Sequence, residues 1–420
     1  MNFKKGSIWS IGVLSVIAGC LLLPTTTRAD VVTDWNARAV QYASTGGRPG
    51  PSWVLDVAVV QVAIYDAVQA IEGDYQPYCG SIPGATGSVV AAAATAARDV
   101  LVARFPGHAA AIEADYSLYM IGILPTDPGI DVGHAAAECV IDLRSTDGAF
   151  PPPPVTPFTG GTLPGQWRNT GSGNLSFPWM GEVTPFTVRS GVQFSAGPPP
   201  RLTSPEYTRA YNEVKNYGVA GTGSSRSTEQ TDLAHFWNGN FPGQFNRLAR
   251  ELAGANGLTV SESSRLMALV DVSMADSAIT AWADKVRYNF WRPVTAILLG
   301  ESDGNPKTIG VPGWTPLVTT PPYPDHTSGA NSLAGSATRA MSLFFGTNEM
   351  EFTITTTNLT VVTDPLKQVR SYSKFSEVRD EVVEARILQG IHFRFADADA
   401  RKQSEHIAQW AHAHHFKPAN

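Results

Sequence analysis

Three short segments in the last third of the chain gather residues that could bind a small anion. Lys285 and Arg292 lie seven residues apart, a spacing that on one helix places both on the same face, about 10 Å apart along the axis. Ser328 and Gly329 follow a proline-rich turn and precede a helical pattern. Free N–H groups and partial positive charge at a helix N-terminus favour phosphate-like anions. The two basic side chains and this terminus could therefore hold one oxyanion.

The third segment contains Arg386 and His392, which lie six residues apart and cannot share a face of one uninterrupted helix. Gly390 between them favours a helix end, so we expect Arg386 in the last turn and His392 just after it. Each segment alone also fits an ordinary role: a solvated basic face, a serine N-cap, or a surface arginine beside a core histidine. Together they predict a pocket for a tetrahedral oxyanion, because lysine and arginine form charge-assisted hydrogen bonds with its oxygens.

Helical periodicity dominates the elements that must position these residues, so we expect an all-α fold of helical bundles with long irregular loops. The sequence predicts one or two helices over 35–71, broken at 46–51. A capping box at 259–262 begins a long helix that should run to residue 291, before Pro293. Further helices are expected over 89–105, 134–144 and 331–345 and after a capping box at 227–230, and a strand signal covers 352–362.

Composition divides the chain into four segments. Residues 1–29 form a leader, 30–149 an N-terminal helical region, 150–205 a Pro/Gly-rich segment and 206–420 a C-terminal helical region. The third segment carries several aromatic residues, so we expect an ordered loop that lies across the helical body and roofs a pocket. The oxyanion pocket should lie in the C-terminal region, the second of two packed bundles.

The leader has the pattern of a secretory signal peptide. Lys4 and Lys5 precede an apolar stretch over 8–23, and a small-residue cleavage site ends at Ala29. This stretch falls short of the roughly 20 residues needed to span a bilayer, so we expect no membrane span. Export with cleavage after Ala29 is the preferred interpretation. The alternative is a lipoprotein acylated at Cys20, because residues 17–20 resemble a lipoprotein cleavage box.

The overall composition limits the partners of the mature chain. Hydrophobic residues make up 43% and charged residues 16% of the sequence, which predicts a packed globular protein with a largely neutral surface. A net charge of −6 without a basic run argues against nucleic acid as a partner. After the leader, Cys79 and Cys139 could pair in an oxidising compartment, but their spacing alone leaves this open. Nothing in the sequence indicates an oligomeric state.

The three segments together resemble the signature of the vanadium-dependent haloperoxidases and the related type 2 phosphatidic acid phosphatases. That signature reads K-x6-R-P, then P-S-G-H, then S-R-x5-H. The matching residues are Lys285, Arg292, Pro293, Ser328, Gly329, Arg386 and His392. Further motifs resemble the soluble bacterial haloperoxidase-like group and extend the resemblance over roughly residues 34–401.

The resemblance implies roles for the binding residues. Lys285, Arg292 and Arg386 would hold the oxygens of the oxyanion, together with Ser328 and the Gly329 amide. Charges fixed in this way also stabilise charge that develops in a transition state.

His392 would be the axial ligand of vanadate in a peroxidase, or the nucleophile that attacks phosphorus in a phosphatase. The resemblance thus implies an exported peroxidase with vanadate as cofactor, or phosphate in its place. Its expected partners are hydrogen peroxide and a halide or small organic substrate.

Two departures from the signature affect catalysis directly. Ala330 stands where the family has the histidine of P-S-G-H, and Thr327 stands at its proline. That histidine is the family's acid–base catalyst, a role typically worth about 10²–10⁴-fold in rate. Either His326 or Asp325 supplies the proton function, or the activity is weak, altered or absent. Ala385 in place of the serine of S-R is a milder change.

Two rival functions therefore accompany the haloperoxidase interpretation. One is an acid phosphatase of the phosphatidic acid phosphatase type with His392 as nucleophile. The other is an oxyanion-binding pseudoenzyme, since Ala330 removes the usual proton donor.

Overall fold

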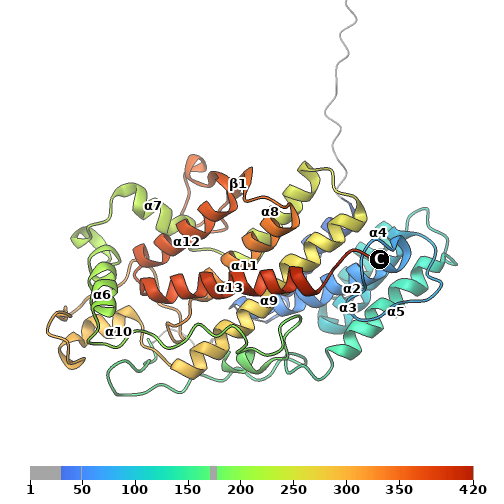
Figure 1. Cartoon of the computed structure of the whole chain (residues 1–420). Helices are drawn as coiled ribbons and strands as arrows, with labels where there is room; N and C mark the ends of the chain where they lie inside the picture. The colour runs from blue at the N-terminus through green and yellow to red at the C-terminus, as the bar shows by residue number, and fades with distance from the viewer. Residues whose placement is uncertain (1–29, 49, 171–176, 420) are drawn as a thin grey trace, which may run out of the picture.

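The computed structural model describes residues 30–48, 50–170 and 177–419, which fold into an elongated helical body (Figure 1). The predicted signal, residues 1–29, lies outside the described residues. The predicted all-α class is confirmed. The α-helices are α1 (Val31–Thr45), α2 (Val54–Glu72), α3 (Val89–Arg104), α4 (Ala109–Tyr119), α5 (Pro128–Leu143), α6 (Pro205–Tyr217), α7 (Thr228–Phe236), α8 (Phe241–Ala255), α9 (Val260–Tyr288), α10 (Pro293–Leu298), α11 (Gly329–Phe344), α12 (Phe375–Leu388) and α13 (Arg394–His414).

The long helix α9 runs through the centre of the molecule, and α2, α11 and α13 pack against it (Figure 1). The largest hydrophobic cluster is continuous from α1 to α13, so both predicted helical regions contribute to one core. Within the described residues, Gly50–Glu72 and Val260–Tyr288 are long and apolar enough to span a membrane. Their apolar windows are 89% and 94% buried inside the structure, as is typical of core helices.

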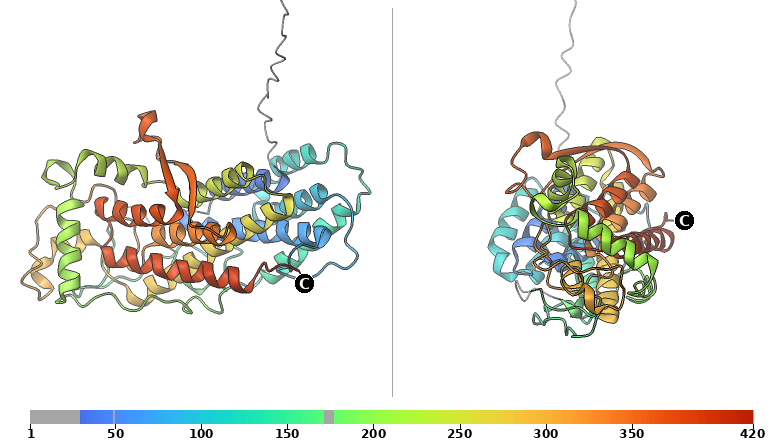
Figure 2. Two further views of the ribbon diagram at one scale, coloured as in Figure 1. Left: turned by 45° about the horizontal axis from the view of Figure 1, so that its top comes forward. Right: turned by 90° about the vertical axis from the view of Figure 1, so that its left-hand side faces the viewer.

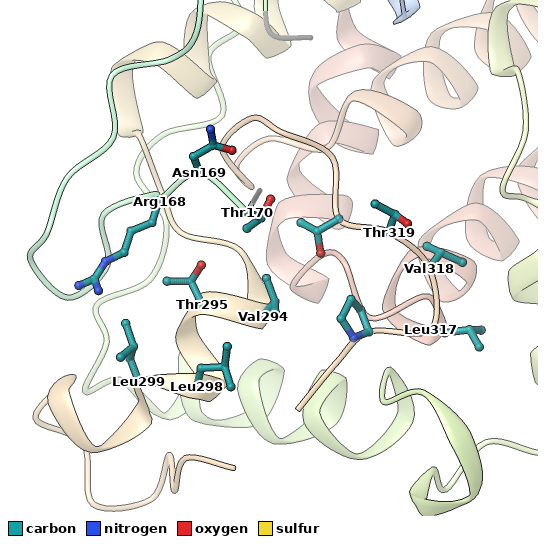
Figure 3. A pocket seen from close by; sticks show the side chains of 12 residues that line it. Arg168, Asn169, Thr170, Val294, Thr295, Leu298, Leu299, Leu317, Val318 and Thr319 are labelled. Atoms are coloured by element: carbon teal, nitrogen blue, oxygen red, sulfur yellow. The ribbon is translucent and has the colours of Figure 1, made fainter. Parts of the chain in front are cut away.

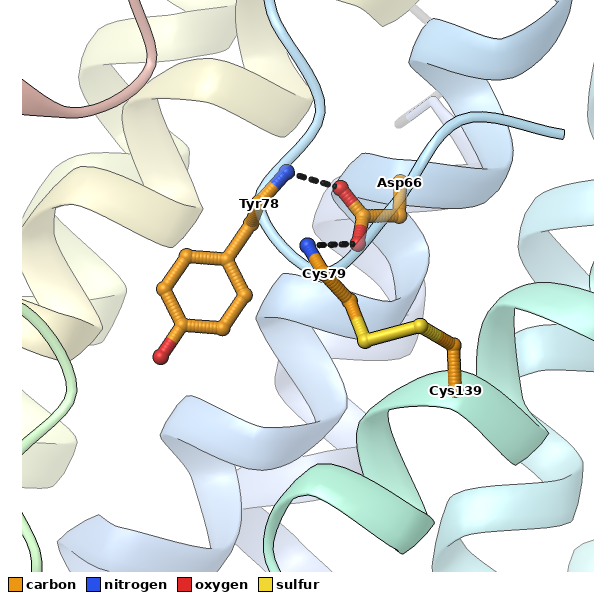
Figure 4. The surroundings of a disulfide bond; sticks show 4 residues. All are labelled: Asp66, Tyr78, Cys79 and Cys139. Carbon is orange, nitrogen blue, oxygen red and sulfur yellow. Dashed lines mark hydrogen bonds between the residues drawn. A yellow bond between two sulfur atoms is a disulfide. The ribbon is translucent and has the colours of Figure 1, made fainter.

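The N-terminal helices are joined by a disulfide between Cys79 and Cys139, which settles the pairing that the spacing left open. The bond links the loop after α2 to α5 (Figure 4). Figure 4 also shows Asp66 of α2 accepting hydrogen bonds from the backbone N–H groups of Tyr78 (2.6 Å) and Cys79 (2.8 Å). The carboxylate therefore fixes the loop that presents Cys79.

Most predicted helix boundaries are set by the local signals that suggested them. The break at 46–51 separates α1 from α2, and α3 covers the predicted 89–105 to within one residue. Both capping boxes are present, at Ser227 with Gln230 and at Thr259 with Glu262. Helix α5 begins at Pro128, six residues before the predicted start at 134, because Asp127 caps it and its side chain accepts from the Gly129 N–H.

The predicted end of the long helix at residue 291 is wrong. Helix α9 ends at Tyr288, and Asn289 adopts a left-handed conformation with φ 44° as its C-cap. Asparagine tolerates this conformation better than most residues. Consequently Arg292 does not lie on the face of α9 with Lys285. It is the N-cap residue of α10.

The predicted strand over 352–362 is also partly wrong. Strand β1 (Glu349–Thr355) begins earlier and ends sooner, and pairs antiparallel with β2 (Val369–Lys374), which the sequence patterns did not single out. The buried pair Phe352 and Tyr372 faces the helical body, and the connection between the strands projects from it (Figure 2).

The Pro/Gly-rich segment is an ordered loop in its described parts, 150–170 and 177–205, as predicted. Trp167 and Phe177 are 2% and 1% exposed. The Phe186 and Thr187 backbone N–H groups donate to Asp276 of α9 over 2.6 Å and 2.8 Å. These buried contacts show that the segment lies across the helical body.

Candidate oxyanion site

His392 is positioned by the tight turn that follows α12. Gly390 has φ 80°, and a Cβ added there would lie 2.3 Å from the Gly218 carbonyl oxygen. Only glycine fits both the conformation and this approach, so the predicted helix end at Gly390 is confirmed. The fully buried imidazole has its Nδ1 2.8 Å from Oδ1 of Asp325, and its Nε2 2.9 Å from Nη1 of Arg292.

Arg292 is held from both sides by backbone carbonyls. Its Nε donates to the Tyr323 oxygen over 2.8 Å, and its Nη1 donates to the Ile391 oxygen over 2.7 Å. The side chain is fully buried, and its Nη2 has no protein partner. A buried donor without a partner is costly, so Nη2 is available for a ligand.

Lys285 lies in the last turn of α9 and is also fully buried. Its Nζ donates to the carbonyl oxygens of Pro324 (2.7 Å) and Asp325 (3.1 Å). Burial, and then the charge of Arg292, holds the pKa of Lys285 well below its ordinary value. Lys285 thus anchors the loop that carries Asp325 next to His392.

Arg386 lies in the last turn of α12, as predicted. Its Nη1 donates to Oε1 of Gln389 over 2.5 Å, and Gln389 in turn donates to the Ala234 oxygen over 2.6 Å. The Nε of Arg386 is buried without a protein partner. Burial lowers the pKa of Arg386 to about 10, which keeps the guanidinium charged at neutral pH.

Ser328 is the N-cap of α11, but its side chain makes no capping bond. Its backbone N–H donates to the Ala396 oxygen over 3.1 Å. A Cβ on Gly329 would lie 3.0 Å from Cζ3 of Trp282, so glycine allows the helix start to pack closely against that ring. The Ser328 hydroxyl instead accepts from Nδ2 of Asn331 over 3.5 Å and forms a side-chain hydrogen bond with Asp397.

Two buried carboxyl groups accompany the three cations. Burial raises the pKa of Asp325 to about 7 and that of Asp397 to about 8. Asn331 donates to Asp397 over 2.8 Å. Because both carboxyl groups protonate near neutral pH, they compensate the charges of Arg292 and Arg386 only in part, and the site keeps an excess of positive charge.

The donor set fits a tetrahedral oxyanion. Nη2 of Arg292 and Nε of Arg386 are buried and unpartnered within the described residues. An anion with several acceptor oxygens would satisfy these donors with charge-assisted hydrogen bonds. Burial, and then the charges of Arg292 and Arg386, hold the pKa of His392 well below its ordinary value. The ring is therefore neutral, and its Nε2 lies 2.9 Å from Nη1 of Arg292.

A cavity of about 430 Å³ opens over this cluster. Gly329, Ala330, Arg386 and His392 line it, whereas Lys285, Arg292 and Ser328 lie behind these residues. The structure thus brings together all six residues predicted to bind the anion. Ala330 faces the cavity in the first turn of α11.

His326 does not line this cavity. Its Nε2 lies 2.9 Å from the Gly197 oxygen, and its ring packs edge-on against Tyr288 at 5.4 Å. Burial lowers its pKa to about 4, so the ring is neutral at physiological pH. Asp325, the other residue considered for the proton function, contacts His392 directly.

Sequence reasoning did not single out Asp397 or Gln389. Asp397 lies in the first turn of α13 and Gln389 is the C-cap of α12. Both are fully buried beside the cations. No spacing rule marks them, because only the packing of α11, α12 and α13 shows that they face the site.

A larger cavity of about 750 Å³ lies elsewhere, between α10 and the chain at 316–320 (Figure 3). Its lining includes Arg168, Asn169 and Thr170 from the Pro/Gly-rich segment, which therefore contributes to a cavity wall. None of the predicted anion-binding residues lines this larger cavity.

Comparisons with known proteins agree with the fold. Residues 265–420 match the family model described as the VCPO second helical-bundle domain. The vanadium chloroperoxidase of Curvularia inaequalis is 24% identical over 199 residues, 40% of this chain. That alignment covers 32% of the chloroperoxidase, so it spans about a third of the relative's length.

Solved structures extend the similarity over nearly the whole chain. A bacterial vanadium-dependent iodoperoxidase matches with a TM-score of 0.73 at 22% identity, covering 93% of this chain and 96% of its own. A holo-type bacterial vanadium-dependent chloroperoxidase matches with a TM-score of 0.69 at 17% identity, covering 89% and 94%. The resemblance in the sequence is confirmed at this level: residues 265–420 match the model of the VCPO second helical-bundle domain, and the chain has the fold of the vanadium-dependent haloperoxidases.

Proposed function

We propose that the protein is an exported vanadium-dependent haloperoxidase that binds vanadate and uses hydrogen peroxide to oxidise a halide. One observation carries the proposal. Arg386 and His392 line one cavity, Arg292 contacts His392, and both arginines carry a buried guanidinium donor that is unpartnered among the described residues. This donor set suits a tetrahedral anion that also accepts a nitrogen ligand.

The chain's own residues bind and orient the anion. Arg292 and Arg386 hold its oxygens, and Lys285 fixes the 323–325 loop while adding positive charge. Oδ1 of Asp325 lies 2.8 Å from Nδ1 of His392, so this contact would hold the orientation of the ring beside the bound anion. When bound, vanadate supplies a Lewis-acidic centre that activates hydrogen peroxide for halide oxidation.

A second candidate is a phosphatase that uses the same pocket. The contact between Asp325 and His392 favours it, because a carboxylate on Nδ1 orients a neutral imidazole whose Nε2 can attack phosphorus. In that reaction phosphate takes the place of vanadate, and the proton that leaves with the alcohol needs a donor. Ala330 does not provide one, so this reaction depends on Asp325 or on solvent.

One purified protein assayed in three ways tests these functions. Vanadate binding, peroxide-dependent bromination and phosphomonoester hydrolysis are measured on the wild type and on His392→Ala. Bromination that His392→Ala abolishes supports the peroxidase, and hydrolysis without bromination supports the phosphatase. Vanadate binding with neither activity identifies a pseudoenzyme and contradicts both enzymatic candidates.

Export is part of the proposal. The secretory pattern at residues 1–29 and the Cys79–Cys139 disulfide support it, because disulfides persist in oxidising compartments. The mature protein should begin at Asp30 and carry no lipid. Mass spectrometry of protein from its native host measures this, and an acylated Cys20 would replace simple cleavage with a lipoprotein.

A further inference from the structure

The cavity over the oxyanion site is lined mainly by rings and apolar side chains. Trp53, Phe241, Trp282 and Tyr323 contribute the rings. Pro51, Pro242 and Leu333 add further apolar surface. The rings of Trp282 and Tyr323 lie 5.2 Å apart at an interplanar angle of 52°. The 50–53 turn, the start of α8 and the start of α11 are distant in sequence and all contribute to the lining.

Few charged or strongly polar groups line this cavity. Arg386 and His392 contribute a cation and an imidazole to its lining. The remaining polar lining residues include exposed Ser44, Asn238 and Asn240. A largely apolar lining with one cation suits a ligand that has an apolar body and one anionic or polar end.

The volume exceeds what the small reactants need. The cavity measures about 430 Å³, whereas a water-sized reactant occupies on the order of 30 Å³. Hydrogen peroxide and a halide ion would therefore fill only a small part of it. Ala330 contributes to this space, since any larger side chain at the start of α11 would project into the cavity.

We propose that this cavity is a recognition site for an aromatic group of an organic substrate, held directly over the oxyanion. The inference rests on the proposed function only in assuming a bound oxyanion, because the aromatic lining residues could bind an arene without it. Aromatic side chains favour tilted and edge-on contacts with a planar ring. Ala330 is a specificity-determining residue, since its small side chain leaves room for that ring.

Calorimetric titration of the purified full chain with three anions distinguishes the contributions of the cavity and the oxyanion site to affinity. Inorganic phosphate reports the oxyanion site alone, methylphosphonate adds one methyl group, and phenylphosphonate adds a ring. Burial of a phenyl group predicts that phenylphosphonate binds roughly ten- to hundredfold more tightly than methylphosphonate. Equal affinities for the two phosphonates would overturn the proposal.

A filling variant and a matched control locate the ring. Ala330→Phe should remove the advantage of phenylphosphonate over methylphosphonate, because the new side chain occupies its place. Ala111→Phe makes the same change at an exposed position of α4 away from this cavity and should keep the advantage. An advantage retained in a folded Ala330→Phe protein would place the phenyl group outside the cavity and overturn the assignment.

Phenol, a neutral arene, tests the cavity without relying on the anion. Saturable phenol binding that Ala330→Phe abolishes supports the proposal even if phosphate does not bind. Failure of phosphate to bind would count only against the oxyanion function. Phenol binding to the phosphate-saturated protein indicates a separate arene substrate. A phenyl advantage seen only with phenylphosphonate indicates an aryl ester. If phenol does not bind and phenylphosphonate has no advantage over methylphosphonate, the proposal is overturned, while the oxyanion site remains intact.

Discussion

Replacing Arg386 with alanine should sharply weaken vanadate binding. The guanidinium lines the cavity from the last turn of α12, and its buried Nε has no protein partner. An anion oxygen would accept from this donor. Loss of one charge-assisted hydrogen bond costs about 1.5–3 kcal/mol, so vanadate affinity should fall roughly ten- to hundredfold.

The substitution also affects the fold, and this effect must be separated from binding. Arg386 donates to Oε1 of Gln389, so alanine leaves that buried oxygen without its partner. Such a loss costs about 1–3 kcal/mol of stability. Arg379→Ala on the same helix is a matched control, because Arg379 is also buried, pairs with Glu405 at 3.0 Å and does not line the cavity.

Calorimetric titration with vanadate, combined with thermal unfolding, distinguishes the two effects. Both variants should unfold at lower temperature than the wild type, but only Arg386→Ala should lose vanadate affinity. Unchanged vanadate affinity in a correctly folded Arg386→Ala protein would refute the assignment of Arg386 to the anion. An equal loss in Arg379→Ala would show that the effect comes from stability.

Three further outcomes follow from the structure. Ala330→His should raise bromination or phosphatase turnover at least about tenfold by restoring a proton donor at the cavity; a folded, vanadate-binding variant without this gain would show that the missing histidine does not limit turnover. Removing the Cys79–Cys139 bond, which closes a 60-residue loop, should lower the free energy of unfolding by about 4 kcal/mol in guanidinium titrations, and a loss below about 1 kcal/mol would contradict this. Burial raises the pKa of Asp271 from 3.8 to about 7, so the folded protein favours the protonated carboxyl. This contribution to the free energy of unfolding is fully present below pH 3.8 and is lost as the pH rises to about 7. Asp271→Asn should therefore flatten the decline in unfolding free energy between about pH 4 and 7, and an unchanged slope would exclude Asp271 as its source.

The sequence predicts best the features that depend on neighbouring residues. The capping box at Thr259 and the left-handed turn at Gly390 are local, so their positions follow from residue type and spacing. The end of α9 was predicted three residues late because Pro293 is a stronger signal than Asn289. Asparagine adopts the left-handed conformation only in some contexts, and here its Nδ2 donates to the Thr159 oxygen over 3.0 Å.

That error changes the geometric argument for the anion site. Lys285 and Arg292 do not converge by sharing a helix face, since the chain leaves the helix between them. They meet because the 323–325 loop accepts hydrogen bonds from both side chains. Contacts of this kind join segments about 40 residues apart, and no local pattern specifies them. The residue set was therefore predictable from spacing and resemblance, whereas its packing was not.

A crystal structure of the protein grown with vanadate tests the central claim most directly. We expect density for vanadate next to the imidazole of His392, within hydrogen-bonding reach of Arg292 and Arg386. The same structure of Arg386→Ala should show this density weakened at equal vanadate concentration. Vanadate bound elsewhere, or no vanadate density beside His392 at saturating vanadate, would contradict this assignment.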